Sequence, residues 1–507
     1  MINSLVYIPS GLQSPELEIL LAKAQEIINS KKKLNIIICS GAKNYACSFN
    51  IYSQKTICIV CKNRLRNGLK NLKGDYNLIE TPQIIRELIL FNEKLHNKIK
   101  DKKKLLKIYY KKIDVGIATY SSYLGISRDL NLEGFFAFKS LKKILKCTIF
   151  LSKFFLSYLK KNKIDEIFIF NGRQNQSRPL FRIAKILKIK VTILEHSTIF
   201  RNSKGVRNYA DNLPFDYNFF SNKIKNHVSK YSSKIKKKYS NNYFEFKQRG
   251  MVVNDKASYI KNQKKDFLPT QWDIKKKNII FLTSSDDEYE VLGNQYKSLH
   301  YQNQTNAVLK IINSFIHKAK SDYHLWIRMH PNLANIKWSY SSNILKLRNL
   351  HPNVHIIKPS SKVSSYKMIS LCDKFLTFNS SSALEAVYIN KPTILLAKTY
   401  FDKLKCFYVP KNHKETIKLI FNSKLVPKKR DEIRKFALFL IESGIKQKYF
   451  SGNFIDGFKF NSKQINYSFF NIPIFYFGKI LTHFFFNSLN YYMRFYNKFD
   501  KNFDKNV

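Results

Sequence analysis

Residues 375–393 read FLTFNSSSALEAVYINKPT, and this stretch says most about the fold. The apolar run Phe375–Phe378 is typical of a buried strand, and Ser382–Ile389 has the spacing of a short helix. Lys391-Pro392 then leads into a second apolar run, Thr393–Leu396. A strand, a turn, a helix and another strand in so short a stretch indicate a parallel sheet covered by helices.

The same rhythm extends through the chain in two series. In the N-terminal half we expect strands at Leu5–Ile8, Leu34–Cys39, Ile113–Thr119, Glu166–Phe170 and Val191–Leu194, and helices at residues 15–28, Phe138–Leu159 and Arg178–Leu187. In the C-terminal half we expect further strands at Asn278–Thr283, Leu325–Met329 and Val354–Ile357, and helices at Thr305–Ala319 and Ser364–Cys372. The sequence therefore predicts an α/β protein with two facing Rossmann-like domains, residues 1–260 and 261–455, followed by a tail, residues 456–507.

Composition limits the class of protein. The chain has 507 residues, 44% of them hydrophobic, which excludes collagen-like and mainly disordered classes. Its formal net charge is +54, with lysines spread along the whole chain, so a general coding bias explains most of the excess. A cationic surface still favours anionic partners, such as an acidic membrane face. Met1–Ser10 has no signal-peptide pattern, and seven cysteines argue against a disulfide framework, so we expect a cytoplasmic protein.

The tail differs from the rest of the chain. Phe469–Phe499 mixes many aromatic residues with Lys479, Arg494 and Lys498. Such a mixture is typical of a helical segment that lies on acidic lipid. Packing of the tail back onto the N-terminal domain is an equally good interpretation.

The turn Asn379-Ser380-Ser381-Ser382 is the first candidate site. It places three hydroxyls and free backbone N–H groups at the start of a helix, an arrangement that binds phosphate. Glu385 follows one turn later and could reach ribose hydroxyls. Simple capping needs only one of these serines, so we favour a ligand-binding site.

A second candidate follows the expected strand at residues 325–329. Arg328 lies in it, and His330-Pro331 comes at its carboxyl end, where ligands of open α/β sheets bind. His330 could donate to a phosphate oxygen. The same tripeptide recurs at His351-Pro352-Asn353, but it precedes the strand Val354–Ile357 and should lie at the opposite edge of the sheet.

A third strand of the C-terminal half also ends in hydroxyls. Ser284 and Ser285 follow Phe281–Thr283 and could face the cleft between the two domains. The acids Asp286-Asp287-Glu288 come next, and we interpret them as the first turn of a helix with no required metal.

The N-terminal domain contains a fourth candidate site. Asn171-Gly172-Arg173 follows a strand, and Arg173 or Arg178 could hold an anionic group. The next strand ends in Glu195-His196, where a carboxylate beside an imidazole could act as the general base for a sugar hydroxyl. A hydrogen-bonded polar turn without catalytic function is the competing interpretation.

Four cysteines are close together in the sequence. Cys39, Cys47, Cys58 and Cys61 could hold a structural zinc ion or an iron–sulfur cluster. They could equally be buried thiols, because Cys39 ends an apolar strand and Cys58–Cys61 also has the pattern of a strand.

These motifs, in this order, resemble those of the capsule polysaccharide biosynthesis proteins, glycosyltransferases with two facing Rossmann-like domains (GT-B). The likeness covers roughly residues 5–450. The His-Pro and Ser-Ser pairs are also similar to those of bacterial sialyltransferases and Kdo transferases, which use CMP-activated sugars. The resemblance implies that His330 and Ser380–Ser382 contact the donor nucleotide and its phosphate. Glu195 is the nearest match to the acidic base motif of those enzymes, although an acid-acid-Gly form is missing here.

The sequence thus predicts a metal-independent glycosyltransferase. It would move a sugar from a nucleotide-sugar donor to a glycan or lipid-linked glycan on the inner face of the cytoplasmic membrane. A nucleotide-sugar 2-epimerase and a polyol-phosphate transferase of the same fold are the alternatives among enzymes. A non-catalytic binder of anionic polymers is the alternative of another class, but no nucleic-acid recognition motif is present.

Overall fold

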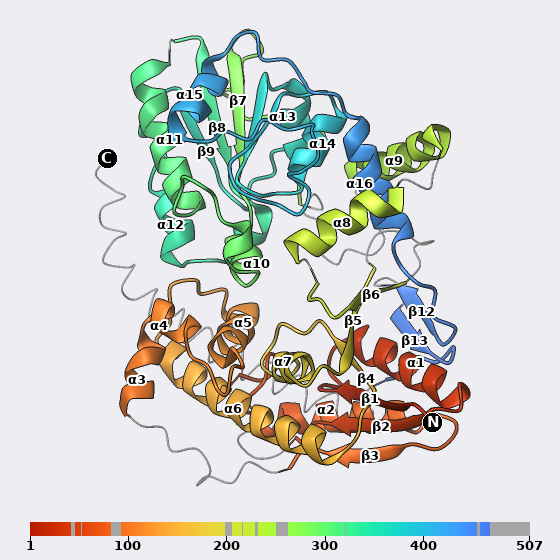
Figure 1. The fold of residues 1–507 in the computed structure, drawn as a ribbon. Helices are drawn as coiled ribbons and strands as arrows, with labels where there is room; N and C mark the ends of the chain where they lie inside the picture. Colours follow the sequence, from red (N-terminus) through yellow and green to blue (C-terminus); the bar gives the residue numbers. More distant parts are fainter. Residues whose placement is uncertain are drawn as a thin grey trace.

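The computed structural model describes residues 1–41, 46–51, 53–82, 93–197, 205–214, 216–228, 232–249, 262–319, 321–453 and 457–466. Two separate parallel sheets organise these residues, one from each half of the chain (Figure 1). The elements of the first sheet and its covering helices are called the N-terminal unit below. Those of the second sheet and its covering helices are called the C-terminal unit.

The N-terminal unit is built on six strands in the order β3-β2-β1-β4-β5-β6. Their bounds are Asn3–Ile8 (β1), Lys33–Ile38 (β2), Asn77–Glu80 (β3), Glu166–Phe170 (β4), Lys190–His196 (β5) and Val206–Ala210 (β6). All neighbours are parallel except β5 and β6. The covering helices are Glu16–Asn29 (α1), Lys55–Leu69 (α2), Glu93–Lys100 (α3), Lys102–Leu106 (α4), Val115–Ser127 (α5), Ala137–Lys161 (α6) and Arg178–Ile186 (α7). Every residue of β4 is buried, as expected for a strand covered on both faces.

The C-terminal unit has five strands, all parallel, in the order β11-β10-β7-β8-β9. Their bounds are Lys277–Leu282 (β7), Tyr323–Arg328 (β8), Val354–Ile357 (β9), Lys374–Thr377 (β10) and Thr393–Leu395 (β11). Its helices are Asp286–Glu290 (α10), Gln304–Lys318 (α11), Ser339–Leu345 (α12), Ser365–Leu371 (α13), Ser382–Tyr388 (α14) and His413–Phe421 (α15), with 3₁₀ turns at Asn294–Tyr296 (η2) and Pro331–Leu333 (η3). The predicted pair of Rossmann-like, GT-B-like domains is confirmed.

Helices from both halves of the chain pack together beside the second sheet. Tyr217–Val228 (α8) and Ser233–Gln248 (α9) come before this sheet in the sequence, and Asp431–Glu442 (α16) comes after it. Figure 1 shows α16, in blue, against the yellow-green α8 and α9, and the rings of Phe220 and Phe439 are 5.0 Å apart. The predicted domain boundary at residues 260–261 lies outside the described residues and stays a prediction.

The chain then returns to the N-terminal unit. Phe450–Asn453 (β12) and Gly457–Phe460 (β13) form an antiparallel hairpin that contacts α1. Arg64 Nε donates to the carbonyl of Ile465 over 2.9 Å. The start of the predicted tail therefore forms a strand on the N-terminal unit. Residues 467–507 lie outside the described residues, so the choice between a lipid-facing and a packed helix stays a prediction.

Two predicted strands are wrong. Residues 113–119 lie mostly in helix α5, and Cys58–Cys61 lies in helix α2. Helix α5 is buried on nearly all sides between neighbouring helices, so its apolar sequence has no clear helical period. In both cases a short apolar run does not distinguish a buried helix from a strand, and the tertiary packing decides.

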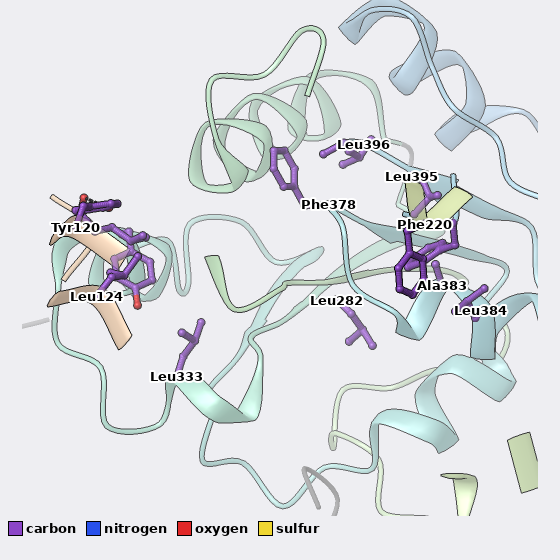
Figure 2. Close-up of a cluster of buried hydrophobic side chains, with 14 of the residues drawn as sticks. Tyr120, Leu124, Phe220, Leu282, Leu333, Phe378, Ala383, Leu384, Leu395 and Leu396 are labelled. Atoms are coloured by element: carbon purple, nitrogen blue, oxygen red, sulfur yellow. Dashed lines mark hydrogen bonds between the residues drawn. The ribbon is translucent and has the colours of Figure 1, made fainter. Parts of the chain in front are cut away.

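The main hydrophobic core is shared by both units. Figure 2 shows part of it, with Tyr120 and Leu124 of α5 at one side and Phe220, Ala383 and Leu384 grouped at the other. A second core lies between the N-terminal sheet, α1 and the β12–β13 hairpin. In the part of the chain that the structure describes, no helix is long and apolar enough to cross a membrane.

Candidate functional site

Three neighbouring strands of the C-terminal sheet bring the predicted donor residues together. Strand β7 lies between β10 and β8, so the segments that follow these strands meet at one edge. The N–H of His330 donates to Thr283 Oγ1 over 2.9 Å, and the N–H of Asn379 donates to Ser284 Oγ over 3.3 Å. The end of β7 therefore joins the His330 turn to the Asn379–Ser382 turn, as the sequence predicted for the edge of a parallel sheet.

His330 is held as a neutral hydrogen-bond donor. Its Nδ1 accepts from the N–H of Asn332 over 3.2 Å, which assigns the ring proton to Nε2. Burial, and after it the nearby Arg128 charge, lowers the pKa of His330 to about 4, so the ring is uncharged at neutral pH. A neutral imidazole with its proton on Nε2 can donate one hydrogen bond to an oxygen of a ligand.

The second His-Pro-Asn tripeptide has the same local geometry at a different place. His351 Nδ1 accepts from the N–H of Asn353 over 3.1 Å, as His330 Nδ1 does from Asn332. However, β8 and β9 are parallel, and His351 precedes β9 whereas His330 follows β8. The two histidines therefore lie at opposite edges of the sheet, as predicted.

The serine turn is organised by its own hydroxyls. Ser380 Oγ accepts from the N–H of Ser382 over 3.3 Å and from its hydroxyl over 2.9 Å. Ser381 is the residue that precedes α14, but its side chain makes no capping bond. Asn379 is 2% exposed, and among the described residues its Oδ1 has no hydrogen-bond partner. An unpaired buried acceptor is costly, so this amide fits a ligand that supplies a donor.

Ser284 and Ser285 are buried and support the loops of the site. Ser284 Oγ accepts from Asn379, while Ser285 Oγ donates to Asp287 Oδ1 over 2.8 Å. Arg128, from the N-terminal unit, donates to Ser285 Oγ over 2.6 Å. Both hydroxyls thus have protein partners.

Three further predicted site residues are engaged by other groups of the protein. Arg328 is 1% exposed and donates to backbone carbonyls of residues 358–361, and burial lowers its pKa to about 10. Glu385 forms an ion pair with Lys247 of α9. Arg178 donates to Asp114 over 2.7 Å and 2.9 Å in a buried two-bond pair. These contacts stabilise the fold around the site.

The N-terminal unit contributes a carboxylate held by the Asn171–Arg173 turn. Asn171 Nδ2 donates to Glu195 Oε2 over 2.9 Å, and Arg173 Nε donates to Asn171 Oδ1 over 3.0 Å. Gly172 has a φ of +73°, and a Cβ there would lie 2.7 Å from Ile193 Cδ1, so the tight turn needs glycine. Burial raises the pKa of Glu195, and Arg173 opposes this rise. A carboxylate with a raised pKa suits a general base.

His196 lies apart from this turn. Its ring packs edge-on against Phe458, with centroids 5.0 Å apart, and against Phe450 at 6.1 Å. Burial, followed by the charge of Arg207, lowers the pKa of His196 to about 4. Successive residues of a strand point to opposite faces, so β5 directs Glu195 and His196 to different surroundings.

The N-terminal cysteines are free thiols. Burial raises the pKa of Cys39, Cys47, Cys58 and Cys61. Gly11 donates its N–H to Cys61 Sγ over 3.1 Å, and Asn50 Nδ2 donates to Cys58 Sγ over 3.3 Å. Within the described ranges no group of three or more ligand-type side chains has an arrangement that could hold a metal ion. The structural metal site therefore stays a prediction without geometric support.

Two residues of interest escaped the sequence analysis. Arg128 ends helix α5 and contacts the C-terminal unit at three places. Glu16 begins α1 and is 4% exposed, and burial raises its pKa to about 8, with Glu195 adding to the rise. Neither residue lies in a recognisable motif, because their partners are distant in the sequence.

Comparison with known proteins finds a family model that matches the central part of the chain. The family model described as "Capsule polysaccharide biosynthesis protein" matches residues 177–404. This range includes Glu195, His330 and Ser380–Ser382 but not the Asn171–Arg173 turn. The family resemblance that the motifs indicated is therefore confirmed over this range. No curated protein matches the sequence significantly.

Several solved structures are similar at low sequence identity. KpsC of Thermosulfurimonas dismutans, a beta Kdo 2,4 transferase, has 11% identity and a TM-score of 0.36, with 54% of this chain and 79% of that chain covered. MnaA of S. aureus with UDP has 11% identity and a TM-score of 0.28, over 88% of this chain and 93% of that one. The UDP-GlcNAc 2-epimerase of Methanocaldococcus jannaschii has 14% identity and a TM-score of 0.25, over 87% and 99%. Likenesses of this size say nothing about the activity of this chain.

Proposed function

We propose that this protein is a glycosyltransferase that moves a sugar from a nucleotide-sugar donor to a capsule or other surface polysaccharide. The main support is the meeting of the His330 turn and the Asn379–Ser382 turn around the end of β7. The family match over residues 177–404 agrees with this reaction class.

The donor would bind to the C-terminal unit at this edge. His330 Nε2–H and the hydroxyl of Ser380, which accepts from Ser382, would donate to the phosphate oxygens, and the buried Asn379 Oδ1 would accept from the nucleoside. Negative charge develops on the phosphate as the sugar leaves. Fixed donors that need no rearrangement stabilise such charge, and this role requires no metal ion. A CMP-activated sugar is the donor that we test first.

The acceptor would approach from the N-terminal unit. Glu195 is held by Asn171, and its raised pKa suits removal of a proton from an acceptor hydroxyl. Arg128 of the N-terminal unit donates to Asp287 of α10 over 2.7 Å, so the two units are in contact beside the donor turns. Glu195 would therefore act as the base opposite the donor phosphate.

The reaction would take place beside a membrane in the cytoplasm. The net charge of +54 would attract the enzyme to anionic lipid that carries the acceptor. Vesicles with and without phosphatidylglycerol test this association. Binding that needs the anionic lipid and disappears at 1 M salt would support it, because salt screens the attraction.

The central experiment uses His330→Ala with His351→Ala as a matched control. Binding of CMP, UDP, GDP and CDP by the full chain is measured first, and turnover of the matching nucleotide sugars is then followed by NMR. We expect His330→Ala to lower kcat by about 10²- to 10³-fold, the usual loss for one such donor. His351 makes the same turn at the other edge, so His351→Ala should leave turnover unchanged. Equal activity of both variants would contradict the proposed site, and isomerised donor without acceptor would indicate an epimerase instead.

A further inference from the structure

A loop of the N-terminal unit contacts the donor side of the C-terminal unit. It consists of Ser127, the last residue of α5, and residues 128–134 that follow it, and is called the clasp loop here. Trp338 Nε1 donates to the carbonyl of Ser127 over 2.9 Å, and Ser339 N donates to Glu133 Oε2 over 2.9 Å. Each of these bonds joins residues more than 200 positions apart. The clasp loop therefore forms an interface between the N-terminal unit and the C-terminal unit.

Arg128 lies at the centre of this interface. Its Nε donates to Asp287 Oδ2 over 2.7 Å and its Nη2 to Asp287 Oδ1 over 2.9 Å, a two-bond pair. The same guanidinium donates to Ser285 Oγ over 2.6 Å and to the carbonyl of Asn332 over 2.6 Å. One side chain thus holds both the loop after β7 and the turn that contains His330.

The backbone at Arg128 supports this arrangement. Its φ is +53°, a left-handed conformation that is uncommon for residues other than glycine. The next residue, Asp129, accepts from the N–H groups of Glu133 and Gly134 and from the hydroxyl of Tyr123. The clasp loop is therefore ordered by its own contacts, and the Arg128 guanidinium is directed from a rigid base.

We propose that Arg128 is a positioning residue that holds the Ser285 loop and the His330 turn in the arrangement that receives the donor phosphate. Four hydrogen bonds from one planar guanidinium explain why arginine suits this place, since a lysine ammonium cannot hold two loops and a carboxylate in the same geometry. The role in donor binding rests on the proposed function. The role in holding the two loops does not.

The experiment compares Arg128→Ala, Arg128→Lys and Asp287→Asn with Arg182→Ala as the matched control. Arg182 also pairs with an aspartate, Asp114, but entirely within the N-terminal unit. Hydrogen exchange is measured for residues 284–290 and 330–338, together with the KM for the donor and kcat. We expect Arg128→Ala to speed exchange in both segments at least ten-fold and to raise the donor KM more than it lowers kcat. Arg128→Lys should recover little, and Arg182→Ala should change neither segment.

The outcomes separate this inference from the proposed function. Unchanged exchange in Arg128→Ala would overturn the positioning role, and a weaker donor affinity in that case would mean that Arg128 contacts the ligand itself. Faster exchange with no change in the donor KM would also overturn it, since the held loops would then not serve the donor. If the wild-type chain binds no nucleotide, the proposed function fails, and faster exchange in both segments would still support Arg128 as the residue that holds them.

Discussion

A buried ion pair between Lys247 and Glu385 provides the sharpest test of how the two halves of the chain stabilise each other. Lys247 Nζ on α9 contacts Glu385 Oε1 on α14, and Glu385 also accepts from the hydroxyl of Tyr366. The side chains are 26% and 7% exposed. Burial lowers the pKa of Lys247, but the Glu385 carboxylate outweighs this and raises it well above its usual value. The ammonium of Lys247 is therefore charged at neutral pH.

Lys247→Met removes one charge and leaves the other buried. Breaking a buried pair in this way usually costs about 3–5 kcal/mol, and the partial exposure of Lys247 favours the lower end, about 3 kcal/mol. The double variant Lys247→Met with Glu385→Leu removes both charges and should recover most of the loss, because an apolar pair of similar volume is tolerated.

Urea unfolding followed by tryptophan fluorescence measures this cost. The three tryptophans, Trp272, Trp326 and Trp338, all lie in the C-terminal half, so the signal reports the part of the protein that contains Glu385. Lys367→Met is the matched control, because its ammonium is 3.6 Å from the exposed Asp266 carboxylate and the pair should contribute less than about 1 kcal/mol. A cost below about 1 kcal/mol for Lys247→Met, or a double variant no more stable than the single one, would refute the reasoning.

We expect two buried carboxyl groups to give opposite pH dependences of the free energy of unfolding. Urea unfolding at several pH values measures both. Burial alone would raise the pKa of Asp114, but Arg178 and Arg182 lower it from 3.8 to about 2, so about 2 kcal/mol of stability present above pH 4 should be lost as pH falls towards 2. Asp114→Asn should lack this loss, and an unaltered acid profile would contradict the pairing. Burial and the charge of Glu195 raise the pKa of Glu16 from 4.5 to about 8, so stability should fall by a few kcal/mol as pH rises from about 5 to 8. Glu16→Gln should flatten this decline, whereas the same slope in the variant would show that Glu16 is not the group responsible.

Local sequence patterns predicted most of the elements that form the site. Strand β4 occupies the predicted residues Glu166–Phe170, and α13 lies within the predicted helix Ser364–Cys372, with Ser364 accepting from the N–H of Lys367 at its start. These patterns depend on burial of short apolar runs and on hydrogen bonds within a few residues, which the chain carries wherever it folds. The turns after β7, β8 and β10 could be predicted for the same reason.

Roles that depend on distant partners could not be predicted in this way. Glu385 was predicted to face ribose, but the fold brings Lys247 of α9 against it. Arg128 had no motif at all, and its partners lie more than 150 residues away along the chain. A charged side chain finds its partner through packing of whole elements, and no local pattern encodes that packing.

The two His-Pro-Asn tripeptides show most clearly what the local sequence determines and what the packing of distant residues determines. In both, the sequence alone determines a turn in which the histidine Nδ1 accepts from the N–H two residues later, because only three adjacent residues take part. Only the tertiary structure places His330 beside Thr283 and brings Arg128 into contact with the same turn at Asn332. It also places His351 at the opposite edge of the sheet. The physical reason is the distance along the chain between the residues that interact. A turn forms through hydrogen bonds between neighbouring residues, whereas a binding site forms only when parallel strands and two packed units bring separate turns to one edge.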